Sequence, residues 1–144
     1  MHFVTGGSFN GKRAWVKKTY GLNSDGCWIS AYQKDHLPKE WTGIKQNILV
    51  LEGIEIWLKE LLEKYDVNDV RDIWNKYLDS WLTWERASGC RHLVLIGTDI
   101  TKGIVPIEAE DRSWRDVAGW AFQDTAAKAS RVDVIWYGLN KTIK

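Results

Sequence analysis

Two continuous apolar runs constrain the fold of this chain more than any other feature of its sequence. Residues 48–51 read ILVL and residues 92–96 read HLVLI. Runs of this kind are typical of strands that are buried on both faces of a parallel sheet. Further strands are expected at residues 2–5, 27–31 and 132–137, with helices over 12–18 and 54–65 and from Val70 and Trp114 onward. Strands therefore alternate with helices, which predicts a three-layer α/β fold with a mostly parallel central sheet.

The connecting segments are less regular. Asn68 or Asp69 is expected to cap the helix that contains Val70. Residues 23–26 and 32–47 are predicted to be loops, and residues 141–144 a short edge strand.

Length and charge limit the classes of protein to consider. The 144 residues are enough for one domain, spanning 1–144, and too few for two. A formal net charge of +1 disfavours a nucleic-acid partner. No apolar run approaches the roughly 20 residues that span a bilayer, and the first residues do not resemble a secretory signal. We therefore expect a cytoplasmic protein, in which Cys27 and Cys90 are reduced thiols.

A glycine-rich turn between the first strand and the first helix carries the clearest chemical signal. Residues 6–12 read GGSFNGK, which fits the motif G-x-x-x-x-G-K of the phosphate-binding P-loop. In such a turn backbone N–H groups surround phosphate oxygens, the helix dipole favours an anion, and the lysine reaches the β- and γ-phosphates. The predicted nucleotide site comprises Gly6, Gly7, Ser8, Phe9, Asn10, Gly11, Lys12 and Arg13, with ATP or GTP as its ligand.

Arg13 departs from the motif. A serine or threonine at this position supplies the hydroxyl that binds Mg²⁺, and an arginine cannot bind a cation. Either other groups hold the metal, or metal-dependent transfer is impaired, or Arg13 pairs with phosphate.

Polar residues that follow the buried strands lie at the edge of the sheet where α/β proteins bind ligands. Glu52 ends one strand and is a candidate catalytic residue and Mg²⁺ ligand; the alternative is that it caps the following helix. Thr98 and Asp99 follow another strand and are expected to face the nucleotide or a substrate, or to belong to a plain connecting loop.

The ten tryptophans allow two interpretations. Trp74, Trp81 and Trp114 fall in or begin apolar helical stripes, which favours packing. Trp28, Trp41, Trp84 and Trp120 leave open a pocket for a large planar ligand.

Taken in order, these segments resemble the bifunctional adenosylcobinamide kinase/adenosylcobinamide-phosphate guanylyltransferase family of cobalamin synthesis. The resemblance is strongest in the last third of the chain and weaker near the middle. Its residues are Gly6, Gly7, Lys34, Asp35, Pro38, Trp41, Leu51, Glu52, Trp57, residues 103–106 (GIVP), residues 115–119 (RDVAG), Gln123, Ala126, Ala127, Val134, Gly138, Ile143 and Lys144.

The resemblance implies a P-loop NTPase-like fold, a trimer or other homo-oligomer, ATP or GTP as substrate, Mg²⁺ as cofactor, and adenosylcobinamide as acceptor. It also implies transfer of GMP through a covalent histidine. The helix that carries this histidine in the family is missing here, and the nearest matching position is Gln33. His36 lies close by and is the candidate substitute.

Two functions follow from this pattern. The first is a kinase, and possibly guanylyltransferase, that acts on a corrinoid. The second is a paralogue that binds nucleotide or corrinoid without catalysis, which Arg13 and the missing histidine favour. A tryptophan-rich binder of single-stranded nucleic acid is a more distant third, because the chain is nearly neutral.

Overall fold

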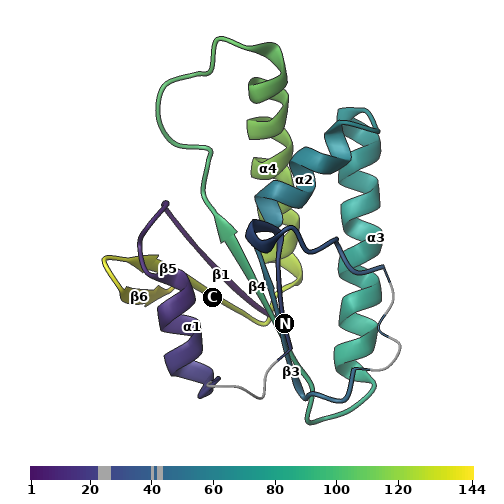
Figure 1. Cartoon of the computed structure of the whole chain (residues 1–144), viewed down its shortest axis with the longest axis vertical. Coiled ribbons are helices and arrows are strands. Elements are labelled where there is room, and N and C mark those ends of the chain that lie inside the picture. Colours follow the sequence, from purple (N-terminus) through teal and green to yellow (C-terminus); the bar gives the residue numbers. More distant parts are fainter. Residues whose placement is uncertain (23–26, 40, 42–43) are drawn as a thin grey trace.

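A computed structural model describes residues 1–22, 27–39, 41 and 44–144 (Figure 1). The loop predicted at 23–26, and positions 40, 42 and 43 of the loop predicted at 32–47, lie outside the described residues. Within the part described, residues 31–33 form a short 3₁₀ helix at the beginning of the second predicted loop. No helix among the described residues has the length and apolar character needed to cross a membrane.

One six-stranded sheet organises the chain. Its strands lie in the order β2-β3-β4-β1-β5-β6, and only β6 runs antiparallel to its neighbour. The continuous apolar runs form the central strands β3 and β4, as predicted. The bounds are β1 His2–Gly6, β2 Cys27–Ser30, β3 Ile48–Glu52, β4 His92–Thr98, β5 Arg131–Trp136 and β6 Leu139–Thr142.

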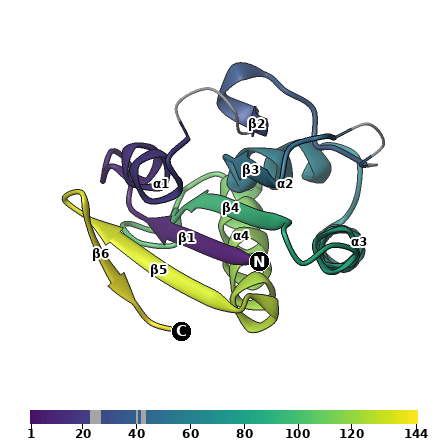
Figure 2. The same cartoon turned by 90° about the horizontal axis from the view of Figure 1, so that it is seen from below.

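Helices cover both faces of this sheet, which confirms the three-layer α/β prediction (Figure 2). Alternate residues of each central strand point to opposite faces. Phe3, Leu51 and Leu95 join a large apolar cluster with α2, α3 and α4. Val4 and Ile96 join a smaller cluster with α1. The helices are α1 Lys12–Tyr20, α2 Ile54–Leu62, α3 Val67–Arg86 and α4 Ala109–Lys128.

The cap of α3 differs from the prediction. Asp66, not Asn68 or Asp69, is the capping residue, and its carboxylate accepts hydrogen bonds from the backbone N–H groups of both. The helix therefore begins a little earlier than its apolar periodicity indicates, because the first turn of a helix is held by polar contacts rather than by core packing.

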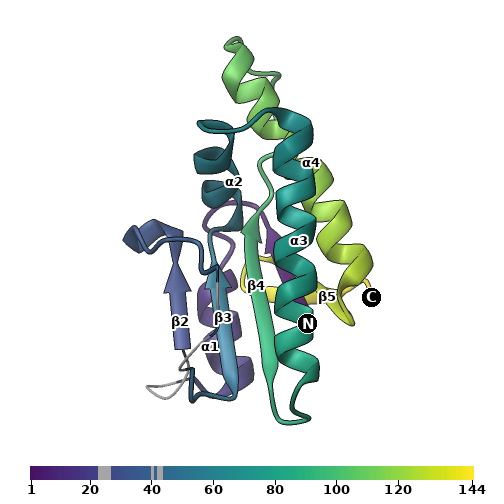
Figure 3. The same cartoon turned by 90° about the vertical axis from the view of Figure 1, so that its right-hand side faces the viewer.

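Helices α3 and α4 pack along one another on the same face of the sheet (Figure 3). The buried indole of Trp74 donates to the Thr125 hydroxyl at 3.0 Å. At the surface, Arg71 forms two hydrogen bonds of 2.8 and 2.9 Å with Asp124. Trp74 is therefore a packing residue between α3 and α4, as its spacing predicts.

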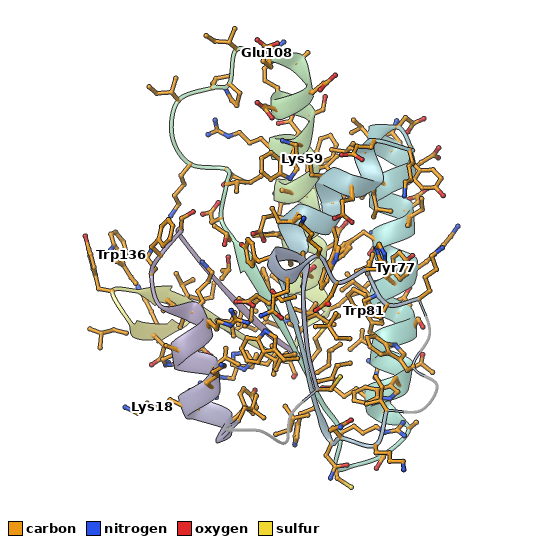
Figure 4. The ribbon with its side chains drawn as sticks, viewed as in Figure 1. Lys18, Lys59, Tyr77, Trp81, Glu108 and Trp136 are labelled. Atoms are coloured by element: carbon orange, nitrogen blue, oxygen red, sulfur yellow. The ribbon has the colours of Figure 1, made fainter. Side chains whose placement is uncertain are left out.

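The other tryptophans of this face also belong to the core. Trp81, labelled with Tyr77 in Figure 4, is fully buried. Two of the tryptophans left open by the sequence, Trp41 and Trp84, lie beside it. The ring centroid of Trp41 is 5.9 Å from that of Trp81 and 5.8 Å from that of Trp84. Edge-to-face and tilted aromatic contacts of this kind stabilise a core. Trp41 and Trp84 are therefore packing residues.

A buried polar network lies at the end of the sheet where β1 and β5 begin. His2 contacts Asp133 at 2.8 Å and the Tyr20 hydroxyl at 2.7 Å. Burial raises the pKa of Asp133, but hydrogen bonds from Thr142, Asn140 and Arg131 outweigh this effect and lower the pKa to about 2. Burial lowers the pKa of His2, and the hydrogen bond to Asp133 offsets that effect only in part.

This network predicts that acid destabilises the fold. A histidine with a lowered pKa stabilises the folded state above its ordinary value of 6.5, and this stabilisation is lost as the pH falls. Asp133 likewise stabilises the folded state when the pH is above 3.8, the ordinary pKa of aspartate. This stabilisation disappears as the pH falls toward 2, the lowered pKa of Asp133. In urea titrations, Asp133→Asn should lower the free energy of unfolding at neutral pH by about 2–3 kcal/mol.

The same variant should flatten the pH dependence below pH 3.8, the ordinary value for aspartate. Asp72→Asn removes an exposed carboxylate from α3 and serves as the control. An Asp133→Asn protein that keeps the parent's acid sensitivity in this range contradicts the assignment.

Candidate functional site

The glycine turn joins the carboxyl end of β1 to the start of α1. Gly6 has a φ of 144°, and a Cβ at this position would lie 2.3 Å from the Ile135 carbonyl oxygen. Gly11 has a φ of 87° and is the N-cap of α1. Both positions require glycine, because other residues rarely adopt these backbone angles and Gly6 has no room for a side chain. The chain therefore leaves the sheet along a path that only these glycines permit.

Lys12 is the first residue of α1, and its side chain folds back over the turn. Its ammonium donates to the carbonyl oxygens of Gly6 at 3.1 Å and Gly7 at 2.8 Å. The residue is only 8 % exposed. Burial lowers the pKa of Lys12, while the carboxylates of Glu55, Glu52 and Asp99 act in the opposite direction. The lysine is thus fixed at the centre of the loop rather than extended into solvent.

A cavity of about 680 Å³ lies against this turn. The first amides of a helix have no partner within the helix, so α1 presents N–H donors at this end. No acidic residue occupies the first turn of α1. The cavity is lined by residues 8–14, Lys17, Tyr32, Glu52, Ile96 and Thr98. Cationic side chains and free amides make this end of the cavity suited to an anion.

Glu52 lines the cavity at the end of β3 and is nearly buried. Its Oε2 accepts hydrogen bonds from Trp28 Nε1 at 2.9 Å and Ser30 Oγ at 2.8 Å, and lies 3.4 Å from Arg13 Nη2. The N-cap of α2 is Gly53, with no side-chain capping bond. The alternative interpretation of Glu52 as a helix cap is therefore wrong.

Trp28 has a further contact at this site. The guanidinium of Arg13 lies 5.2 Å from the centroid of its ring and the Lys17 ammonium 5.5 Å from it. Cations at this distance from an indole face are attracted by its electron density. Trp28 therefore contacts both Arg13 and Glu52, while its part in a pocket for a planar ligand stays a prediction.

A second carboxylate, Glu55, lies beneath the cavity and was not identified from the sequence. It is buried, accepts a hydrogen bond from the Thr98 backbone N–H at 2.9 Å, and contacts the Tyr32 hydroxyl. Burial and the neighbouring Glu55 raise the pKa of Tyr32, which keeps its hydroxyl protonated and donating. The available signal was a glutamate in the first turn of the helix that follows Glu52.

Thr98 and Asp99 face different cavities. Thr98 lines the cavity beside Lys12, and its hydroxyl lies 3.0 Å from that of Tyr32. The Asp99 carboxylate instead accepts hydrogen bonds from the backbone N–H and hydroxyl of Thr101, and lines a separate cavity of about 540 Å³ beside α4. The structure thus brings Thr98, but not Asp99, onto the wall of the candidate nucleotide cavity. Trp120 lines the separate cavity and is partly exposed.

The segment after β2 places the candidate nucleophile away from this cavity. Gln33 ends the 3₁₀ helix and is exposed. Asp35 is anchored, since its carboxylate accepts from the Ser30 N–H at 2.9 Å and its carbonyl accepts from Trp57 Nε1 at 2.8 Å. His36 follows on the surface and does not line the cavity.

The residues present give Mg²⁺ little support at Glu52. Among the residues that the structure describes, no group of three or more His, Cys, Asp or Glu side chains could hold a metal ion. Glu52 Oε2 already accepts two hydrogen bonds and faces a guanidinium. Mg²⁺ requires oxygen ligands at about 2.0–2.1 Å in near-octahedral geometry. A metal ion at Oε2 would have to displace the indole N–H, the Ser30 hydroxyl or the guanidinium that already contact this oxygen.

The parallel sheet, the glycine turn at the end of β1 and the helix that follows it define a P-loop NTPase-like α/β fold. Residues 23–143 match the family described as cobinamide kinase / cobinamide phosphate guanyltransferase, and the chain belongs to that family. This match confirms the family that the C-terminal residues resemble. The matched region begins after the glycine turn. The assignment of the turn as a phosphate-binding loop therefore rests on the turn's sequence and geometry and not on this match. No curated protein matches the chain.

Proposed function

We propose that this chain binds a nucleoside triphosphate at residues 8–13 and phosphorylates a corrinoid alcohol in cobalamin synthesis or salvage. The observation that carries the proposal is the buried ammonium of Lys12, held across the carbonyls of Gly6 and Gly7 beside the cavity at the start of α1. Membership of the family supports cobinamide as the acceptor. The cytoplasmic location expected from the sequence stays a prediction.

The proposed reaction uses the cavity as follows. The amides at the start of α1 and the Lys12 ammonium bind the phosphates and offset the negative charge that develops on them. An acceptor hydroxyl attacks the γ-phosphorus, the bond to the β–γ bridging oxygen breaks, and the nucleoside diphosphate leaves. Glu52 is the carboxylate on the cavity wall that takes the hydroxyl proton.

The second candidate function is nucleotide or corrinoid binding without catalysis. The contacts of Glu52 favour it, because an oxygen that accepts from Trp28 and Ser30 and faces Arg13 is a poor proton acceptor. Incubation with ATP or GTP and adenosylcobinamide separates the two functions. Phosphorylated corrinoid supports the kinase, whereas binding of either ligand in calorimetry without product supports the second candidate.

Removal of the Lys12 ammonium should weaken nucleotide binding. A charge-assisted hydrogen bond of this kind contributes about 1.5–3 kcal/mol, so Lys12→Ala should raise the Kd for ATP or GTP by roughly 10- to 100-fold in isothermal titration. Lys18→Ala removes an exposed lysine from the same helix and is the matched control. Parent-like affinity in Lys12→Ala would show that the phosphate loop is wrongly assigned.

Guanylyl transfer through a covalent histidine is not expected. The nucleophile must lie in line with the α-phosphate, and a displacement of about 1 Å can cost a hundredfold in rate. His36 is exposed and outside the cavity wall. Intact-protein mass spectrometry after incubation with GTP and Mg²⁺ should therefore show no GMP adduct. An adduct that disappears in His36→Ala contradicts this and restores a bifunctional enzyme.

We also expect a homo-oligomer, and by resemblance to the family a trimer. Apolar side chains remain exposed around the β5–β6 hairpin and the loop before α4, and Trp136 points outward from the hairpin in Figure 4. Exposed apolar patches of this kind mark interaction surfaces. Light scattering should give a mass well above the 16.7 kDa of one chain. A single 16.7 kDa species at micromolar concentration contradicts the prediction. The exposed apolar residues of the hairpin and of the loop before α4 are Ile104, Val105, Ile107, Trp136, Tyr137 and Leu139.

A further inference from the structure

The position after the loop lysine holds a cation where the motif calls for a metal-binding hydroxyl. Arg13 lines the cavity directly beside Lys12. Its Nη2 lies 3.4 Å from Glu52 Oε2, and its guanidinium lies over the ring of Trp28. The side chain is 43 % exposed, and these two partners orient it.

Arg13 is held in place but is not fully hydrogen-bonded. Its Nε is buried, and no partner for it occurs among the residues that the structure describes. A buried N–H without an acceptor is unfavourable, and an added acceptor removes that cost. Guanidinium groups bind phosphate oxygens through paired N–H donors, so a guanidinium that turns from Glu52 toward a phosphate in this cavity would gain the missing acceptor.

Oε2 of Glu52 offers no open place for a metal ion. Trp28 Nε1 can only donate a hydrogen bond, and it donates to the Glu52 oxygen that also faces Arg13. A divalent cation at this oxygen would have to displace the indole N–H and the guanidinium together. It would also lie close to the guanidinium charge, and like charges repel strongly in a partly buried site.

We propose that Arg13 takes the place of the divalent cation, so that this site binds the metal-free nucleotide. On binding, the guanidinium exchanges its contact with Glu52 for the β- and γ-phosphate oxygens, while Trp28 retains Glu52 through its indole N–H. Lys12, Arg13 and Lys17 then surround the phosphates with positive charge. The inference rests on the proposed nucleotide site and specifies the form of ligand that the site selects.

Calorimetric titration of ATP and GTP, each with EDTA or with excess MgCl₂, tests this directly. The parent protein should bind the metal-free nucleotide at least as tightly as the Mg²⁺ complex. Arg13→Ser restores the hydroxyl and removes the competing cation. Its affinity in EDTA should fall by roughly tenfold or more, and Mg²⁺ should now strengthen binding.

Lys18→Ser is the matched control, since it makes the same change of charge on an exposed side chain that Figure 4 shows at the far end of α1. It should keep the parent's ratio of affinities with and without Mg²⁺. Circular dichroism checks that each variant is folded, and Arg13→Gln provides a second removal of the charge if Arg13→Ser does not fold.

The outcomes separate this inference from the proposed function. Tight binding by the parent only in MgCl₂ overturns the role of Arg13 and leaves the nucleotide site intact. An Arg13→Ser protein with the parent's Mg²⁺ response overturns it as well. No binding of ATP or GTP under either condition overturns both the inference and the proposed nucleotide site.

Discussion

The geometry of the candidate site depends on the Gly6 carbonyl, where β1 ends. Its oxygen accepts a hydrogen bond from the Asp99 N–H at 3.0 Å and another from the Lys12 ammonium at 3.1 Å. One acceptor therefore joins the end of β4, the end of β1 and the start of α1. The φ of 144° at Gly6 and its closeness to Ile135 make this arrangement possible only for glycine. Lys12 from α1 and Thr98 from the end of β4 both line the cavity beside this junction.

The second constraint is electrostatic. Lys12 lies near two buried carboxylates, Glu52 and Glu55, which come from the end of β3 and the start of α2. Buried charges are tolerated when they are paired and hydrogen-bonded, and Trp28, Ser30, Tyr32 and Thr98 supply those bonds. The polar floor of the cavity is thus assembled before any ligand binds. A preorganised set of donors and charges of this kind loses little entropy when an anion enters.

Most of the fold could be predicted from the sequence, because it follows from local patterns. Continuous apolar runs identified β3 and β4. The glycine turn between a strand and a helix identified residues 8–13, which line the cavity. Glu52 could be placed at the sheet edge for the same reason. The pairing of Glu55 with Tyr32 could not, since it joins two residues that no periodicity connects.

The direction in which a side chain points was the other feature that could not be predicted from the sequence. Thr98 and Asp99 are neighbours in the chain, yet successive side chains at a strand end point to opposite faces, and only one reaches the cavity. Arg13 was recognised as a departure from the motif, but its contacts with Trp28 and Glu52 depend on how β2 lies beside β3. The cap of α3 was placed two or three residues late because Asp66 precedes every apolar position of that helix.

The β5–β6 hairpin carries a mechanical consequence for the glycine turn. The Gly138 N–H at its tip donates to the Asn10 carbonyl at 2.9 Å, so the outermost turn of the sheet is tied to the loop that precedes Lys12. Strand β6 is exposed and is the outermost strand of the sheet in the part of the chain that the structure describes. If pairing with this edge changes the strength of that hydrogen bond, it changes the energy of the loop, and a ligand in the loop then shifts the affinity of the edge by the same factor. This hydrogen bond is the contact through which such coupling between the hairpin and the loop would pass.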